Sequence, residues 1–355
     1  MRYRRTALAA MGYELAPNVV SSAALESRLL PLYQGLKLKP GQIEALTGIR
    51  ERRFWDPGFS IAEGALRAGK KALEQAGLTG RDLGALVYTG VCRQGFEPAT
   101  ACAVAEGLGV SGSATVLDLS NACLGVLNGC LMVGNMIELG QIRAGLVVSC
   151  ESAREITEAT IDRMLAAGTI ECFKISLATL TGGSGAVAML LGDGESGLGG
   201  ARHRLAGGVL RAAPEHHRLC YWGPERNGFG NGNGNGHVPH IVMETDATEV
   251  LKNGVALGQQ TWRDLMTALE WSPAQVSKVI CHQVGGGHRS AMLAALGVTD
   301  DKDYSTYEYL GNSGTVALPL TAAMADERGF LEGGDRVAFL GIGSGLNCLM
   351  LGVKW

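Results

Sequence analysis

Cys123 is the residue of this sequence with the clearest chemical context. It follows an apolar run from Thr115 to Leu119 and the turn Ser120-Asn121-Ala122, and it begins a Gly- and Ala-rich segment typical of a helix. The N-terminus of a helix favours an anion, and thiolate is the form of cysteine that attacks a carbonyl carbon. The context therefore predicts a nucleophile, whereas the rest of the nine cysteines are expected to be buried apolar residues.

His282 and Asn312 stand in turns that leave room for a ligand. His282 ends an apolar run and precedes the glycine-rich exit Gln283 to His288. A neutral imidazole there can donate a hydrogen bond, although a core histidine satisfied by its neighbours fits the same pattern. Asn312 lies in Gly311-Asn312-Ser313-Gly314, where an asparagine can also act only as a helix cap.

The run Gly341-Ile342-Gly343-Ser344-Gly345 has backbone N–H groups that suit an anion. A dinucleotide-binding loop is disfavoured, because no full β-α-β unit follows the run. We expect an oxyanion hole, in which one N–H donor contributes about 3 to 4 kcal/mol of transition-state stabilisation.

An internal duplication explains how these residues come together. In the first copy the run Leu86 to Val91 precedes a helix ending in Gly-Leu-Gly-Val, and in the second Val279 to Val284 precedes one ending in Ala-Leu-Gly-Val. The segment after Cys123 is matched by the segment after Asn312. The pseudo-twofold relation is therefore expected to place Asn312 opposite Cys123.

Strands that alternate with helices predict an α/β fold with parallel sheets covered on both faces. With 355 residues, 46% of them hydrophobic, the chain can form two such sheets around buried helices of small residues. The predicted halves are residues 1–175, with the nucleophile, and 176–355, with the histidine and the asparagine. An Asn/Gly-rich insertion at 227–236 predicts a loop, more often without a role than acting as a lid.

The composition excludes several function classes. A net charge of -3 and a pI near 6.2 give no field that would gather a nucleic acid. No run of about 18 apolar residues is present to span a bilayer, and we interpret Tyr3 to Gly12 as a strand, not as a signal peptide. Scattered cysteines without a C-x-x-C pair predict reduced thiols in the cytoplasm and no metal or cofactor.

Taken together, these segments resemble the thiolase superfamily, and most closely the ketoacyl synthase III-like acyl-CoA condensing enzymes of bacterial olefin biosynthesis (OleA type). The resemblance covers nearly the whole chain. It rests on Thr47 to Arg53, Asn121 to Leu124, His282-Gln283-Val284, Gly311-Asn312 and Gly341 to Cys348. It implies a thiolase fold, in which two duplicated βαβαβαββ halves form a five-layered αβαβα sandwich.

The resemblance also implies a reaction. Cys123 would take an acyl group from coenzyme A as a thioester, while backbone N–H groups of Cys123 and Ser344 hold the oxyanion. A second acyl-CoA would lose an α-proton, and its enolate, held by His282 and Asn312, would attack acyl-Cys123. This Claisen condensation gives a β-keto product, the first step of long-chain olefin or ketone biosynthesis.

Glu97, between Phe96 and Pro98, matches the glutamate that in these enzymes reaches from a partner subunit as the base. The resemblance therefore implies a homodimer, with downstream olefin-pathway enzymes as further partners. By itself, Glu97 also fits a solvated acid at a helix N-terminus.

Three alternative functions stay open. A synthase III that decarboxylates a malonyl donor needs no base, so a carboxylate at Glu97 favours two unactivated acyl-CoA substrates. A cysteine-dependent ester or thioester hydrolase would use the same Cys-His pair, and its products would identify it. A binding partner without catalytic activity would form no acyl adduct on Cys123.

Overall fold

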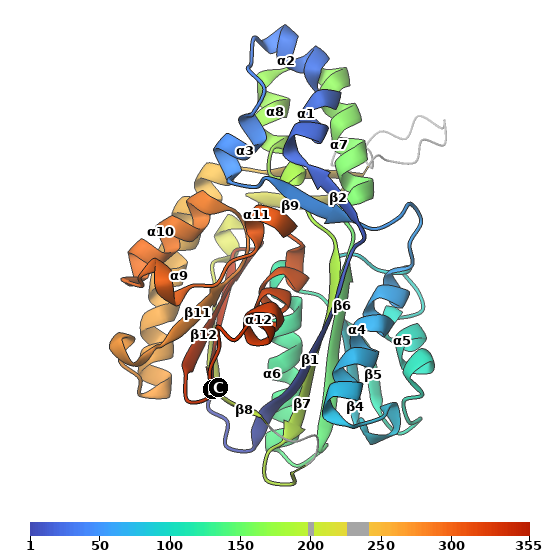
Figure 1. Ribbon diagram of the computed structural model, residues 1–355, viewed down its shortest axis with the longest axis vertical. Helices are drawn as coiled ribbons and strands as arrows, with labels where there is room; N and C mark the ends of the chain where they lie inside the picture. Colours follow the sequence, from blue (N-terminus) through green and yellow to red (C-terminus); the bar gives the residue numbers. More distant parts are fainter. Residues whose placement is uncertain (198–201, 226–240) are drawn as a thin grey trace.

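A computed structural model describes residues 1–197, 202–225 and 241–355, which surround one mixed sheet of nine strands (Figure 1). The predicted insertion at 227–236 lies outside the described residues. The strand order is β11-β12-β13-β8-β1-β7-β6-β4-β5. The strands are β1 (Thr6–Leu15), β4 (Ala85–Thr89), β5 (Thr115–Leu119), β6 (Ala144–Glu151), β7 (Gly185–Asp193), β8 (His203–Ala212), β11 (Lys278–Cys281), β12 (Arg336–Gly343) and β13 (Asn347–Lys354).

The sheet has the same order on both sides of its centre. There β1 pairs with β8 through Ala7↔Arg204 and Leu8↔His203, and β7, β6 and β4 on one side match β13, β12 and β11 on the other. On the first side β5 is the outermost strand. At the matching place on the second side, the described residues form an isolated bridge between Val279 and Asp303. The predicted duplication is confirmed, with one strand of the second copy reduced to that bridge.

The expectation of parallel sheets is wrong for most of the strand pairs. Only β4–β5, β4–β6 and β11–β12 pair in parallel among the described strands of this sheet, and the other pairs are antiparallel. The connection between β12 and β13 shows one reason. It has three residues, 344–346, and a crossover between parallel strands needs a dozen or more.

Helices complete a five-layered sandwich, as predicted (Figure 1). Helices α4 (Ile61–Ala76) and α5 (Thr100–Leu108) pack on the outer face of the first half of the sheet. On the second half, α9 (Ala247–Leu269) and α10 (Gly286–Leu296) take the same place. Between the two halves lie α6 (Gly125–Glu138) and α12 (Ala317–Glu327), which share one core with strands from both.

The two central helices are buried almost all round, which explains their small residues. In α12 every residue from Ala317 to Ala325 is buried. In α6 a Cβ atom on Gly129 would come within 2.6 Å of Val147 Cγ1, so a larger residue there would push the helix off the sheet. The small residues in the sequence of these helices thus indicate that the helices pack closely against the sheet.

The remaining elements gather mainly at one end of the molecule (Figure 1). They are α1 (Ser22–Arg28), α2 (Leu30–Leu36), α3 (Gln42–Thr47), α7 (Arg154–Ala167), α8 (Ile170–Ser176) and α11 (Tyr307–Leu310), with the strand pairs β2 (Asn18–Ser21)–β3 (Glu51–Phe54) and β9 (Cys220–Pro224)–β10 (Ile241–Thr245). The predicted division of the chain at residue 175 falls within α8 and stays a prediction. None of the helices in the described ranges has the length and apolarity needed to cross a bilayer.

Candidate active site

Cys123 lies in a tight turn at the end of the edge strand. A 3-10 turn, η2 (Ala122–Leu124), connects β5 to α6, which begins at Gly125 and not at the cysteine. Ala122 has φ 43°, in the left-handed region that non-glycine residues rarely adopt. Such a conformation costs of the order of 1 to 3 kcal/mol and is found most often at functional sites.

The Cys123 thiol is protonated in the resting protein, which differs from the expected thiolate. Burial, with smaller contributions from the negative charge of Glu151 and from the Cys220 thiol, raises its pKa to about 12. The N–H group of the cysteine itself acts in the opposite direction but is outweighed. The sequence correctly placed Cys123 near a helix N-terminus, but it did not predict the desolvation. The thiol therefore has to lose its proton as it attacks the acyl group.

The end of β12 lies against the nucleophile. A Cβ atom built on Gly343 would stand 3.5 Å from the Cys123 nitrogen and 3.6 Å from its Cβ. The next residue, Ser344, belongs to the turn between β12 and β13 and hydrogen-bonds to the Cys220 side chain. The Gly-Ile-Gly-Ser-Gly run therefore borders Cys123, as an oxyanion loop would.

Side-chain amides connect the Cys123 turn to the Ser344 turn. Asn347 Nδ2 donates to Asn121 Oδ1 at 3.2 Å and to the Ser344 carbonyl oxygen at 3.3 Å. Asn121 Nδ2 in turn donates to Asn128 Oδ1 on α6 at 2.8 Å. These bonds fix the two turns relative to each other.

His282 is buried next to the same strand end. It directly follows β11, and its N–H donates to the carbonyl of Leu340 on β12 at 3.0 Å. Burial, and secondarily the nearby His288, lowers its pKa to about 4, so the imidazole is neutral near physiological pH. Its Nδ1 atom is buried and has no hydrogen-bond partner among the described residues. An unpartnered polar atom of a neutral imidazole suits a hydrogen bond to a ligand.

Asn312 leads into η7 (Gly314–Val316), the counterpart of η2 in the second copy. Its Oδ1 accepts from the Gly314 N–H at 3.1 Å, so it does act as a turn residue. The two turns also touch: Thr315 Oγ1 accepts from the Val126 N–H of α6 at 2.8 Å, and η7 packs on η2. The elements that carry Cys123 and Asn312 therefore face each other, as the duplication predicted.

Glu97 stands apart from these four residues. It lies in the loop between β4 and α5, its side chain is exposed, and it makes no hydrogen bond or ion pair with the described residues. The preceding residue, Phe96, is also fully exposed, at 105%. Within one chain the loop points outward.

Glu151 is a buried carboxylate beside the nucleophile that sequence analysis did not single out. It is the last residue of β6, is 4% exposed, and contributes to the raised pKa of Cys123. The signal was present as an acidic residue at the end of a mostly apolar run, Leu146 to Cys150, which Ser149 interrupts. Within the described ranges, no group of three or more His, Cys, Asp or Glu residues could hold a metal ion.

Comparison with known proteins identifies relatives along the entire chain. Residues 266–355 match the family described as 3-oxoacyl-[acyl-carrier-protein (ACP)] synthase III C terminal. The chain is 53% identical to an acyl-CoA:acyl-CoA alkyltransferase of Shewanella oneidensis and 34% identical to one of Xanthomonas campestris pv. campestris. Each of these alignments covers 100% of both chains.

A solved structure of a variant of Xanthomonas campestris OleA with bound lauric acid and lauroyl-CoA has the same fold. Its TM-score is 0.90 at 34% sequence identity, and the match covers 99% of this chain and 100% of that chain. The expected thiolase fold is confirmed.

Proposed function

This chain belongs to the acyl-CoA:acyl-CoA alkyltransferases (OleA), the ketoacyl synthase III-like condensing enzymes of the thiolase superfamily, and we propose that Cys123, His282 and Asn312 are its reaction centre. It is an acyltransferase that condenses fatty acyl-CoA molecules. One observation carries the choice of residues: η2, which contains Cys123, packs on both η7 and the glycine end of β12. Asn312 leads into η7, and His282 follows β11, the parallel neighbour of β12.

The first half-reaction forms an acyl-enzyme. The Cys123 sulfur attacks the carbonyl carbon of an acyl-CoA, the bond from that carbon to coenzyme A breaks, and coenzyme A leaves as a thiol with the proton. The N–H groups of Cys123 and of the Ser344 turn hold the oxyanion. The placement of Gly343 against Cys123 supports this role, because a side chain there would fill the space beside the reacting carbon.

The second half-reaction forms the carbon–carbon bond. A base removes an α-proton from a second acyl-CoA, the enolate carbon attacks acyl-Cys123, and the sulfur leaves and regains a proton. The product is a β-ketoacyl thioester, which hydrolysis converts to a β-keto acid. A neutral His282 suits this step as a donor to the enolate oxygen, since an imidazolium would give up its proton to the enolate.

We assign the base to Glu97 of a second subunit. The exposed Phe96–Glu97 segment has no hydrogen-bond or ion-pair partner among the described residues, and it belongs to the loop that follows β4, the neighbour of the edge strand β5. All five residues of β5 keep exposed surface, whereas those of its neighbour β4 are buried. An open edge of this kind is suited to pairing with the same edge of a second copy.

A single-substrate assay tests the proposed function. The enzyme is incubated with lauroyl-CoA and no malonyl donor, and free coenzyme A and products are followed by mass spectrometry. Free coenzyme A together with a β-keto acid, or the ketone left after loss of carbon dioxide, is the expected result. Lauric acid alone would indicate a hydrolase. Coenzyme A release that needs malonyl-CoA or malonyl-acyl carrier protein would indicate a decarboxylating synthase.

Two further statements stay predictions. They are the location of the chain in the cytoplasm and its association with downstream olefin-pathway enzymes.

A further inference from the structure

Glu151 is a buried carboxylate that the proposed reaction does not use. Its Oε1 accepts from the Val91 N–H at 2.9 Å and its Oε2 from the Cys92 N–H at 3.0 Å. The Thr315 N–H is a third donor. Among the described residues the carboxylate makes no ion pair, so backbone N–H groups replace its solvent.

The three donors come from two loops that carry proposed site residues. Val91 and Cys92 begin the loop that continues to Glu97, and Thr315 belongs to the turn that follows Asn312. Both loops lie close to Glu151 and its neighbour in the chain. Cys92 Sγ also accepts from the Ser152 N–H at 3.4 Å, and a Cβ atom on Gly314 would stand 3.5 Å from the carboxyl carbon of Glu151.

The loop beyond Cys92 is also held by hydrogen bonds. The position of Val91 and Cys92 therefore affects the position of Glu97. The Gln94 N–H donates to Thr100 Oγ1 at the start of α5 at 3.1 Å, and Gln94 Oε1 accepts from Ser60 Oγ at 3.0 Å. Because Gln94 is only two residues after Cys92, a displacement of Val91 and Cys92 would shift Gln94 and, with it, the start of the segment that contains Glu97.

An amide could not replace this carboxylate without loss. A carboxylate only accepts hydrogen bonds, whereas the NH₂ group of glutamine would face an N–H donor on one side. Burying a charge without a cation is unfavourable, so an ionised Glu151 lowers the stability of the folded protein. Burial raises the pKa of Glu151, and the N–H donors offset only part of this effect. A purely structural contact would not need a charge beside the nucleophile.

We propose that Glu151 is a positioning residue for the condensation, which holds in place the Asn312 turn near its own Cys123 and the start of the loop that presents Glu97 to a second subunit. This inference rests on the proposed function, because it concerns the second half-reaction. Acylation of Cys123 needs neither loop in its exact place, whereas carbon–carbon bond formation needs both. A misplacement of about 1 Å can cost about 100-fold in rate.

The charge of Glu151 supplies a second readout, independent of turnover. The titratable groups that it affects are Tyr88, Cys92, Cys123 and Cys150, and the pKa of each is raised. Removal of the negative charge favours the thiolate, so the pKa of Cys123 falls. This readout tests whether Glu151 is ionised near the nucleophile, whereas the difference between acylation and condensation tests its positioning role.

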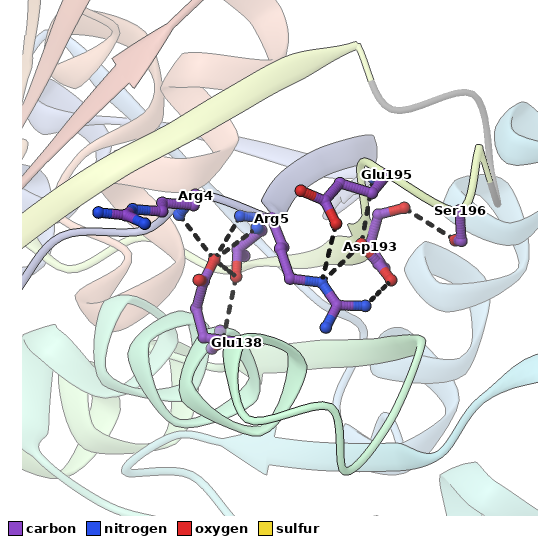
Figure 2. Close-up of polar contacts among 8 residues, drawn as sticks. Arg4, Arg5, Glu138, Asp193, Glu195 and Ser196 are labelled. Carbon is purple, nitrogen blue, oxygen red and sulfur yellow. Dashed lines mark hydrogen bonds and ion pairs between the residues drawn. The ribbon is translucent and has the colours of Figure 1, made fainter.

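The test compares Glu151→Gln and Glu151→Asp with Glu138→Gln. Glu138 is the matched control, since its Oε1 also accepts three backbone N–H groups, but at the other end of α6 (Figure 2). Three quantities are measured with lauroyl-CoA: condensation rate, acyl adduct on Cys123 by intact mass, and pH dependence of Cys123 alkylation by iodoacetamide, read by peptide mapping.

The two substitutions at Glu151 separate position from charge. Glu151→Gln is expected to lower kcat for condensation about 10- to 100-fold, to keep acyl adduct formation within about threefold, and to move the alkylation profile to lower pH. Glu151→Asp is expected to lower kcat similarly, because the shorter side chain cannot reach both loops, and to leave the profile in place. Glu138→Gln should change none of the three.

Several results would overturn the inference. One is condensation by Glu151→Gln at the rate of Glu138→Gln; another is equal loss of acylation and condensation. Failure of both Glu151 variants to fold would assign the residue to structure alone. If the unmodified enzyme forms no condensation product, the proposed function fails and this inference fails with it. If the unmodified enzyme and Glu151→Gln both condense lauroyl-CoA at the same rate, only this inference fails.

Discussion

Helix α6 has a carboxylate beside each end, and the two carboxylates differ in what surrounds them. At the C-terminal end, here called the anchor end, Glu138 Oε1 accepts from the N–H groups of Arg4, Arg5 and Thr6 at 2.9, 2.7 and 2.8 Å (Figure 2). At the other end, the nucleophile end, Glu151 accepts N–H groups from two separate loops. Similar hydrogen bonds therefore occur at both ends.

The pKa values of the two carboxylates nevertheless move in opposite directions. At Glu138 partial burial raises the pKa, but the donors of Thr6, Arg5 and Arg4 outweigh it, so the net pKa is lowered. At Glu151 the effect of burial is larger than the effect of the N–H donors, so the pKa is raised. Backbone donors are present at both ends, so the opposite directions teach that the extent of desolvation decides whether the donors outweigh burial.

The sign of each shift has a consequence for stability. A lowered folded pKa means that Glu138 stabilises the fold above its ordinary pKa of 4.5, and that this contribution is lost as the pH falls through the folded value. A raised folded pKa means that Glu151 favours the folded state at low pH, and that this is lost as the pH rises through its own folded value. The nucleophile end therefore carries a stability cost near neutral pH.

The largest effect is expected from loss of the nucleophile. Cys123→Ala should abolish the acyl adduct and lower condensation by at least about 10⁴-fold, because no other group can form the covalent intermediate. Intact-mass analysis and coenzyme A release measure both effects. Cys130→Ala, a buried cysteine further along α6, is the control and should keep the adduct. An acylated Cys123→Ala protein would place the nucleophile elsewhere.

A large effect that depends on the partner is expected from Glu97→Gln. Loss of the base should lower condensation about 10²- to 10⁴-fold while acylation of Cys123 continues. If Glu97 acts across a dimer, mixing unfolded Glu97→Gln and Cys123→Ala subunits and refolding them together should restore activity. Roughly a quarter of normal activity is expected, since half of the dimers are mixed and each has one complete site. No recovery from a mixed dimer would contradict action across subunits.

His282→Ala should lower condensation about 100- to 1,000-fold and leave the acyl adduct in place, by loss of one donor to the enolate. The unmodified enzyme should show no step in rate from this residue near the ordinary pKa of 6.5, because the folded pKa is about 4. The unfolded chain binds the proton more readily, so His282 lowers stability as the pH falls below 6.5. A rate profile with a histidine step that vanishes in His282→Ala would refute a neutral imidazole.

The smallest effect on activity is expected at the anchor end. Glu138→Gln should lower the free energy of unfolding by about 1 to 3 kcal/mol, since one acceptor for the backbone donors weakens, and leave condensation unchanged. Urea unfolding measures the stability. The difference from the unmodified protein should shrink as the pH falls from 4.5 through the lower pKa of the folded protein, where the Glu138 carboxylate becomes protonated. A stability difference independent of pH would mean that the charge of Glu138 is not its source.

Much of the fold could be predicted because its signals are local. The strand from Thr115 to Leu119 occurs where the sequence predicted it. A boundary that differs is at the ends of the first strand, because β1 spans Thr6–Leu15, not Tyr3 to Gly12. Antiparallel pairing was missed because strand direction depends on which strands become neighbours.

What the sequence by itself determined is the duplication and the choice of Cys123, His282 and Asn312, because each stands in a turn whose neighbours define it locally. Only the tertiary structure decided the protonation of Cys123 and the presence of Glu151 beside it. The donors of Glu151 come from residues about 60 positions before it and about 160 positions after it, so no local pattern reports them. The burial of Cys123 also depends on residues from layers that are distant in the chain. This burial raises the pKa of the thiol more than the local backbone N–H group lowers it.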